Sequence, residues 1–171
     1  MKRIVLFAMA VLAFTASSVA QKYALVDMEY ILKNIPSYEM ANEQLNQVSQ
    51  RWQKECDDKA AEAKTMYKNY QSDLVFLTEE MKVKREEEIR DKETEVVELR
   101  RKYFGPEGEL FKKRESLMKP IQDDIYNAIK KISEDKGYMM VIVRATSPNI
   151  IFASPKIDIS NEVLTKLGYS K

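Results

Sequence analysis

The sequence predicts an α+β protein that is mostly α, in which a long antiparallel helical hairpin, a coiled-coil-like arm, is attached to a small β-body. From Ser37 to Phe104 there are 68 residues without a glycine or a proline, which favours uninterrupted helix. Short β-prone runs lie toward both ends of the chain, and short strands form a stable sheet only when they meet. The helical segment must therefore turn back, because run straight it would extend about 100 Å.

The first 20 residues have the features of a secretory signal peptide. Lys2 and Arg3 precede an apolar run of 11 residues, and the small residues Ser18 and Ala20 fit a cleavage site. The run is shorter than the roughly 20 apolar residues that a membrane-spanning helix needs. We expect cleavage after Ala20 and export of residues 21–171, in which 26 basic residues face 27 acidic ones because Lys2 and Arg3 are removed.

The β-body is expected to comprise residues 21–36 and 119–171. Alternating β-prone residues predict strands over 22–28, 138–144 and 149–153, the last two joined by a Thr-Ser-Pro turn. A helix between the first and second strands is expected to carry Pro120 in its first turn and to end at Gly137. A final amphipathic helix is predicted over 159–167.

The arm is expected to comprise residues 37–118, with its tip near 73–78. Eleven apolar or small residues between Ala41 and Leu77 have a mean spacing of 3.6, which is typical of one helix face. The apolar run 74–77 breaks this period, and Thr78 followed by two glutamates has the features of a helix N-cap. A reversal at Gly105 would instead leave the strands about 60 Å apart, so residues 105–108 are expected to be a loop or bulge.

Composition excludes most enzyme classes. The chain has no histidine, which excludes histidine general bases and the usual zinc sites, and a single cysteine, Cys56, which excludes an internal disulfide. Charged residues make up 32% of the chain, as expected for solvated helices, and the net charge is only +1. We expect no enzyme activity, no catalytic residue, no metal and no cofactor.

Several groups of residues resemble functional sites, but a purely structural role explains them better. Paired acidic residues such as Asp57-Asp58 are expected to be solvated helix faces, and Cys56 falls on the apolar stripe as a buried thiol. The basic and aromatic run 100–104 is a pattern that nucleic-acid binders use, but export and near-neutral charge favour no nucleic-acid partner.

Large apolar side chains gather toward the tip, where a two-helix arm has little core to bury them. Packing within the hairpin is the simpler interpretation for Trp52. This interpretation becomes weaker for residues 74–77, where four consecutive apolar residues surround the helix. The candidate binding residues are Tyr67, Tyr70, Leu74, Phe76, Leu77 and Met81.

The order of elements and three short motifs resemble the Skp/OmpH family of periplasmic chaperones. The motifs are YALVDM at 23–28, GYMMVIV at 137–143, and Asp158-Ile159-Ser160 before Val163-Leu164. The resemblance covers essentially the whole exported chain. It implies a homotrimer whose strands join in a central β-body, with trimerisation residues at Leu25, Val26, Val141, Val143 and Ile151.

The resemblance also implies a function. The arms of the trimer would enclose a cavity that holds unfolded outer-membrane β-barrel proteins in the periplasm without ATP, and contact with lipopolysaccharide or a membrane surface is a further implied interaction. The alternative is a structural coiled-coil protein of the cell envelope. The two differ in whether apolar surface stays available for a partner or is used up in helix pairing.

Overall fold

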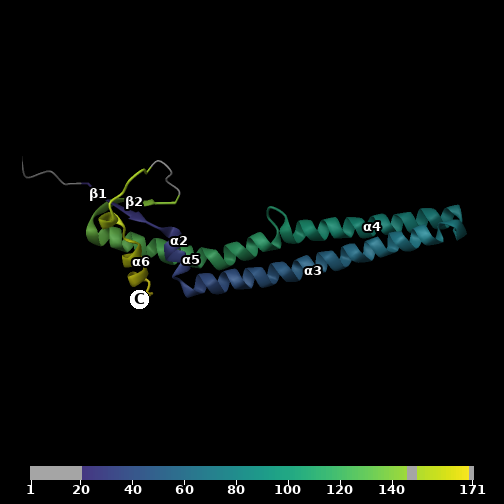
Figure 1. The fold of residues 1–171 in the computed structure, drawn as a ribbon, viewed down its shortest axis with the longest axis horizontal. Helices are drawn as coiled ribbons and strands as arrows, with labels where there is room; N and C mark the ends of the chain where they lie inside the picture. Colours follow the sequence, from purple (N-terminus) through teal and green to yellow (C-terminus); the bar gives the residue numbers. More distant parts are fainter. Residues whose placement is uncertain (1–20, 146–149, 170–171) are drawn as a thin grey trace, which may run out of the picture. The chain divides into compact units, whose positions relative to one another are not determined.

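The computed structural model describes residues 21–145 and 150–169, which form two compact units. One unit, the arm, comprises Ile35–Asp124, and the other, the body, combines residues up to Asn34 with those from Ile125 onward. The signal peptide predicted at 1–20 and the Thr-Ser-Pro turn lie outside the described residues. The elements, in chain order, are β1 (Lys22–Val26), α2 (Met28–Lys33), α3 (Pro36–Asp73), η2 (Leu74–Phe76), α4 (Glu79–Phe104), α5 (Glu109–Lys136), β2 (Tyr138–Val143), η3 (Pro155–Ile157) and α6 (Ser160–Lys166) (Figure 1).

The body contains a two-stranded parallel sheet, in which Tyr23 pairs with Met140 and Val26 with Val143. Parallel strands need a long crossover connection, and here all of α2, α3, α4 and α5 lies between the two strands. Gly137 joins α5 to β2 with a φ of 69°, a left-handed conformation that glycine adopts without steric cost.

Helices of the body bury the apolar side chains of β1. Ala24, Leu25 and Val26 of β1 are buried together with branched residues of α2, α5 and α6, namely Ile31, Ile125, Ile132, Val163 and Leu164. The one buried polar residue among those described, Ser160, is fully satisfied. Its hydroxyl accepts from the Asp27 backbone N–H at 2.8 Å and donates to Asp158 Oδ1 at 2.6 Å.

The strand predicted over 149–153 is wrong for residues 150–153, which form no strand, while residue 149 lies outside the described part. The open edge of β1 instead pairs with residues 158 and 159, further along the chain. Leu25 forms an isolated bridge with Asp158, and its carbonyl accepts from Ile159 N–H at 2.9 Å. Residues 158 and 159 therefore occupy the edge of β1 that residues 150–153 were expected to reach, and these apolar residues stay irregular, because β propensity alone does not supply a hydrogen-bonding partner.

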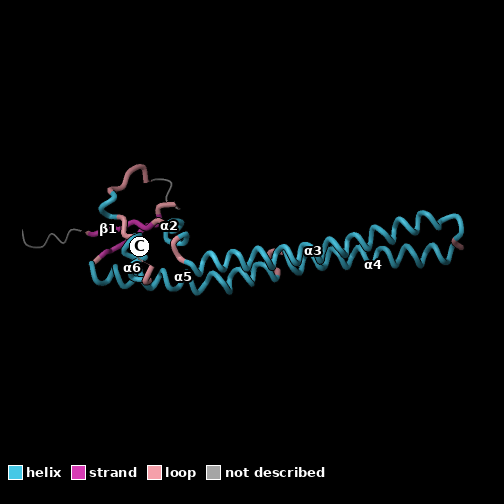
Figure 2. The backbone as a smooth tube through the Cα atoms, turned by 60° about the horizontal axis from the view of Figure 1, so that its bottom comes forward, coloured by secondary structure: helices cyan, strands magenta, loops and turns pink. Residues whose placement is uncertain are grey.

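The arm is an antiparallel pair formed by α3 on one side and α4 with the first part of α5 on the other (Figures 1 and 2). The buried seam of the arm consists of small and branched side chains of α3 and α4 and one aromatic ring: Ala41, Leu45, Cys56, Ala63, Ile89, Val96 and Tyr103. The chain reverses at η2 and Leu77, within the range 73–78 indicated by the sequence. The helical class of the protein and its hairpin are thus as predicted.

Pro120 is not in the first turn of a helix, as the sequence suggested, but inside α5, which begins at Glu109. The ring is exposed, so the proline removes one backbone donor on the solvent side. The apolar face continues past it through Leu117, Ile121 and Ile125. Packing of this face explains why the helix tolerates the proline.

Replacing Ile125 by alanine should destabilise the protein by about 2–5 kcal/mol, because the side chain is only 1% exposed and its removal leaves a cavity. Urea unfolding followed by circular dichroism measures this loss. The neighbouring Tyr126 is 66% exposed, so Tyr126→Ala is the matched control and should change the stability by no more than about 0.5 kcal/mol. Equal losses from the two variants would show that this part of α5 is not packed.

Candidate functional site

The tip of the arm is built from the end of α3, η2 and the start of α4. After η2, Leu77 takes an extended conformation and Thr78 caps α4. The Thr78 hydroxyl oxygen accepts from Met81 N–H at 3.3 Å, and its carbonyl accepts from Lys82 N–H at 3.0 Å. This cap starts α4 immediately after the reversal, so the connecting segment is too short to cover its own apolar side chains.

The tip exposes apolar side chains that no other described element covers. Phe76 and Val75 are each 83% exposed, and Leu74, Met81 and Tyr67 are also exposed. Leu77 and Tyr70 are half-buried and line a small hollow together with Met66 and Ile89. Five of the seven side chains therefore present much of their surface to solvent, which is the property of a partner-binding surface.

Sequence reasoning omitted two exposed residues of this surface, Val75 and Val83. Val75 lies inside the run 74–77, and four consecutive apolar residues cannot all face one side of a helix. That run was the signal that could have identified it. Val83 lies one turn after Glu79 on a helix whose other residues are mostly charged, and it carries no comparable signal.

The tyrosine hydroxyls near the tip are engaged in hydrogen bonds. Tyr70 donates to Glu86 of α4, and this bond raises the pKa of Tyr70 to about 12. The Tyr67 hydroxyl accepts from Gln71 Nε2 at 2.9 Å. Tyr70 therefore stays neutral at physiological pH and links α3 to α4 just below the tip.

The residues predicted for trimerisation fall into three groups by their burial in the single chain. Leu25 and Val26 are buried within the single chain, and Val141 and Val143 are half-buried. Ile151 is fully exposed, and the same unit also exposes Phe152, Met139 and Met140, which sequence reasoning did not select. The sequence predicts Ile151 and Phe152 to lie in a strand, but both lie in an irregular segment and are exposed in the single chain.

The described residues offer no group of histidine, cysteine, aspartate and glutamate side chains arranged to hold a metal ion. Within the same part of the chain, no helix is long and apolar enough to cross a membrane.

The profile of the OmpH-like outer membrane protein family matches residues 22–167. The chain belongs to the OmpH-like family. A solved structure from Caulobacter crescentus CB15, described as an OmpH-like outer membrane chaperone, superposes on this chain with a TM-score of 0.70. The match covers 88% of this chain and 86% of that one at 9% sequence identity, so it concerns the fold. No curated protein matches the sequence significantly.

Ion pairs join the two helices in the middle of the OmpH-like arm. Lys59 of α3 lies 3.4 Å from Glu95 of α4, and Lys92 of α4 lies 3.6 Å from Glu62 of α3. Lys92 also pairs with Glu95 at 2.7 Å within α4. Hydrogen bonds from Lys92 and Lys59 lower the pKa of Glu95, and the bond to Glu95 raises the pKa of Lys92.

Trp52 packs within the hairpin, as the simpler interpretation held. Its ring stacks on Tyr103 of α4 with centroids 4.7 Å apart and planes 4° apart, and the Tyr103 hydroxyl donates to Glu55 at 2.9 Å. Tyr103 is thus engaged inside the OmpH-like arm.

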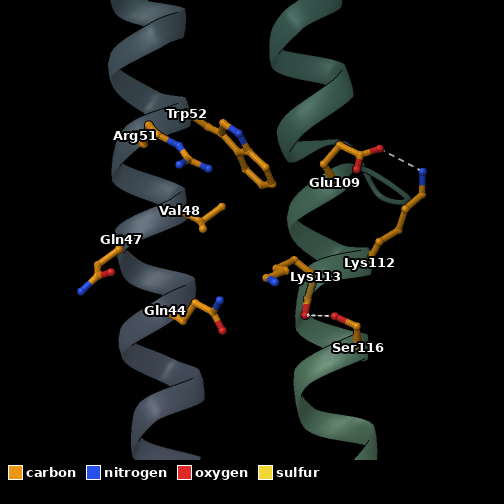
Figure 3. A pocket seen from close by; sticks show the side chains of 9 residues that line it. All are labelled: Gln44, Gln47, Val48, Arg51, Trp52, Glu109, Lys112, Lys113 and Ser116. Atoms are coloured by element: carbon orange, nitrogen blue, oxygen red, sulfur yellow. Dashed lines mark hydrogen bonds and ion pairs between the residues drawn. The ribbon is translucent and has the colours of Figure 1, made fainter.

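A polar groove beside Trp52 is lined by α3 and α5 (Figure 3). Glu109 and Lys112 form an ion pair across 3.1 Å, and the other lining residues are Gln44, Gln47, Val48, Arg51, Lys113 and Ser116. Ser116 donates its hydroxyl hydrogen to the Lys113 carbonyl at 2.9 Å.

The ion pairs of the OmpH-like arm predict how its stability depends on pH. Because the pKa of Glu95 is lower in the folded state, this carboxylate stabilises the fold above its ordinary pKa, and the contribution is lost as the pH falls through the lowered value. Glu95→Gln should therefore lower the melting temperature slightly at pH 7, and the difference from the wild type should vanish in acid. Thermal unfolding followed by circular dichroism, from pH 7 down into acid, measures this difference in melting temperature. A difference that persists in acid would assign the effect to packing.

Proposed function

We propose that this protein is an ATP-independent holdase chaperone that binds unfolded outer-membrane β-barrel proteins and prevents their aggregation. The observation that carries the proposal is the exposed apolar tip on an arm of the OmpH-like fold, where Val75 and Phe76 are each 83% exposed. An unfolded membrane barrel protein presents alternating apolar residues that aggregate in water. A surface of this kind shields such residues without recognising one sequence.

The chemistry of the tip suits binding that is followed by release without an energy source. Met81 is flexible and polarisable, and the aromatic and branched side chains around it adapt to different partners. Each contact is weak, and several arms acting together raise the effective concentration of binding surface around one client. The client leaves when its own folding competes with these contacts.

The site of action is proposed to be the periplasm. The signal peptide expected at residues 1–20 would export the chain, and the OmpH-like match begins immediately after it at residue 22. Contact with lipopolysaccharide or a membrane surface remains an expectation from the resemblance.

The body supports the proposal of a homotrimer. A sheet of two strands is too small to be stable by itself, and its edges can accept further pairing. The exposed Ile151, Phe152, Met139 and Met140 supply apolar surface in the same unit. Association of three copies through this surface would bury it and would arrange three arms around one space.

The alternative, a structural coiled-coil protein, has less support. Helix pairing consumes the seam between α3 and α4, but it leaves the tip side chains exposed. A structural arm would have no use for exposed aromatic and branched residues at its end.

Replacing Val75 and Phe76 together by serine should weaken protection of an unfolded outer-membrane barrel protein, because the two most exposed apolar side chains of the tip are lost. Light scattering of the diluted barrel protein, at near-equal molar ratio and without nucleotide, measures protection. The matched control replaces Val97 and Phe111 by serine, the same residue types exposed elsewhere on the arm. Equal protection by both variants and the wild type would remove the tip from the binding surface.

A charge at Ile151 should dissociate the trimer while leaving each chain folded, because this side chain is fully exposed in the single chain and packs on nothing there. Size-exclusion chromatography with light scattering should report a trimer for the wild type and monomers for Ile151→Asp. Val97→Asp, on an exposed position of α4, is the control and should stay trimeric. A wild-type monomer at micromolar concentration would contradict the proposed assembly.

A further inference from the structure

The return side of the arm is interrupted at residues 105–108. The last backbone hydrogen bond of α4 is donated by Gly105 N–H to the Arg101 carbonyl at 2.9 Å. The first of α5 is donated by Lys112 N–H to the Gly108 carbonyl at 3.1 Å. Between these two bonds, a single turn is closed by a hydrogen bond from Gly108 N–H to the Gly105 carbonyl at 2.9 Å. Pro106, inside this turn, has no N–H to donate. The helical ladder of hydrogen bonds therefore stops and restarts, and the loop projects from the path of the helices (Figure 1).

Close backbone approach requires both glycines of this loop. A Cβ at Gly105 would lie 2.4 Å from the Arg101 carbonyl oxygen. A Cβ at Gly108 would lie 2.8 Å from the Tyr103 oxygen and 2.9 Å from the Lys102 oxygen. Any other residue at either position would move the backbone, so the compact loop depends on glycine at both its ends.

The end of α4 is nevertheless attached firmly to α3. Tyr103, in the last turn of α4, is only 8% exposed. It stacks on Trp52 with ring centroids 4.7 Å apart and donates its hydroxyl hydrogen to Glu55 at 2.9 Å. Stacked aromatic pairs contribute beyond the area they bury, and here the hydrogen bond also sets the orientation of the ring.

The interruption does not disturb the phase of the apolar seam. Ile89, Val96 and Tyr103 are buried at intervals of seven residues. The half-buried Leu110 and Leu117 continue the same interval on the other side of the loop. The four loop residues nearly equal one helical turn of 3.6 residues, so α5 resumes on the face that α4 left.

The mechanical consequence follows from helix geometry. Two helices packed side by side resist bending in their common plane, because the helix on the inner side would have to shorten and its hydrogen bonds fix the rise per residue. A single continuous helix such as α3 can curve gently. Where the second helix is interrupted, the end of α4 and the start of α5 can move toward or away from each other. The resistance to bending in the common plane is lost there.

We propose that residues 105–108 are a joint at which the arm bends in the plane of its two helices. The contact of Tyr103 with Trp52 and Glu55 keeps α4 on α3 during the motion, so that α4, the tip and the distal part of α3 move as one piece relative to α5. The joint goes beyond the proposed chaperone function, because it concerns the mechanics of the arm whatever the tip binds.

Spin labels on either side of the joint test the proposal. Exposed positions Glu93 and Glu115 flank the loop, and labels there, with Cys56 replaced by alanine, report the distance by pulsed electron resonance. The matched control pair, Gln50 and Ser72, has the same separation of 22 residues within the uninterrupted α3. We expect a broader distance distribution across the joint than within α3. Equal widths for the two pairs would overturn the proposal.

Deleting residues 105–108 should join α4 to α5, because Leu110 would then follow Tyr103 by three residues on the same face. The distance distribution across the former joint should narrow to the width of the control pair. An unchanged width in a folded deletion variant would contradict the joint.

Amide exchange of the unaltered chain provides a second test that does not depend on the deletion variant folding. Residues 105–112 should exchange faster than residues 89–103, which remain attached to α3. Tyr103→Ala should extend fast exchange into residues 96–104 and shift the emission of Trp52, the only tryptophan of the chain. Tyr103→Phe keeps the stacking and should leave the emission nearly unchanged. Slow exchange throughout 105–112 would show that the loop is rigid.

Discussion

The narrow apolar seam between α3 and the returning helices is the contact on which the arm depends. Its buried side chains are Ala41, Leu45, Cys56 and Ala63 of α3, which are small or slender, and Ile89, Val96 and Tyr103 of α4. Helices rich in charged residues have little reason to associate apart from such a seam, since exposed ion pairs such as Lys59 with Glu95 add little to stability. The seam therefore holds the hairpin, and the ion pairs lie along its exposed sides.

A two-helix seam has room for only a few large side chains, and this limit shows at two places of the arm. Trp52 and Tyr103 are accommodated by stacking where the return side is interrupted at Gly105. At the tip no third element is available, so Val75 and Phe76 remain on the surface. The shortage of core therefore leaves a candidate binding surface at the tip, while the stacked pair attaches α4 to α3 beside the candidate joint.

The body follows a different principle. Its two strands are far apart in the chain, and each is short, so helices α2 and α6 must bury what the sheet leaves uncovered. They do so for Leu25 and Val26 of β1, but Met139 and Met140 of β2 remain exposed. Because the body buries β1 more completely than β2, it keeps exposed apolar surface that further copies of the chain could bury.

The sequence by itself determined the helical class, the hairpin and the place of its reversal, because periodicity, caps and the lack of glycine act over a few residues. It did not determine where apolar residues would find partners. Ile151 and Phe152 were predicted to lie in a strand but form none, since Asp158 and Ile159 pair with β1 instead. Pro120 looked like a helix start but lies inside α5. Strand pairing, the stacking of Tyr103 on Trp52 and the exposure of Val75 were decided only by tertiary structure, because each depends on residues distant in the chain.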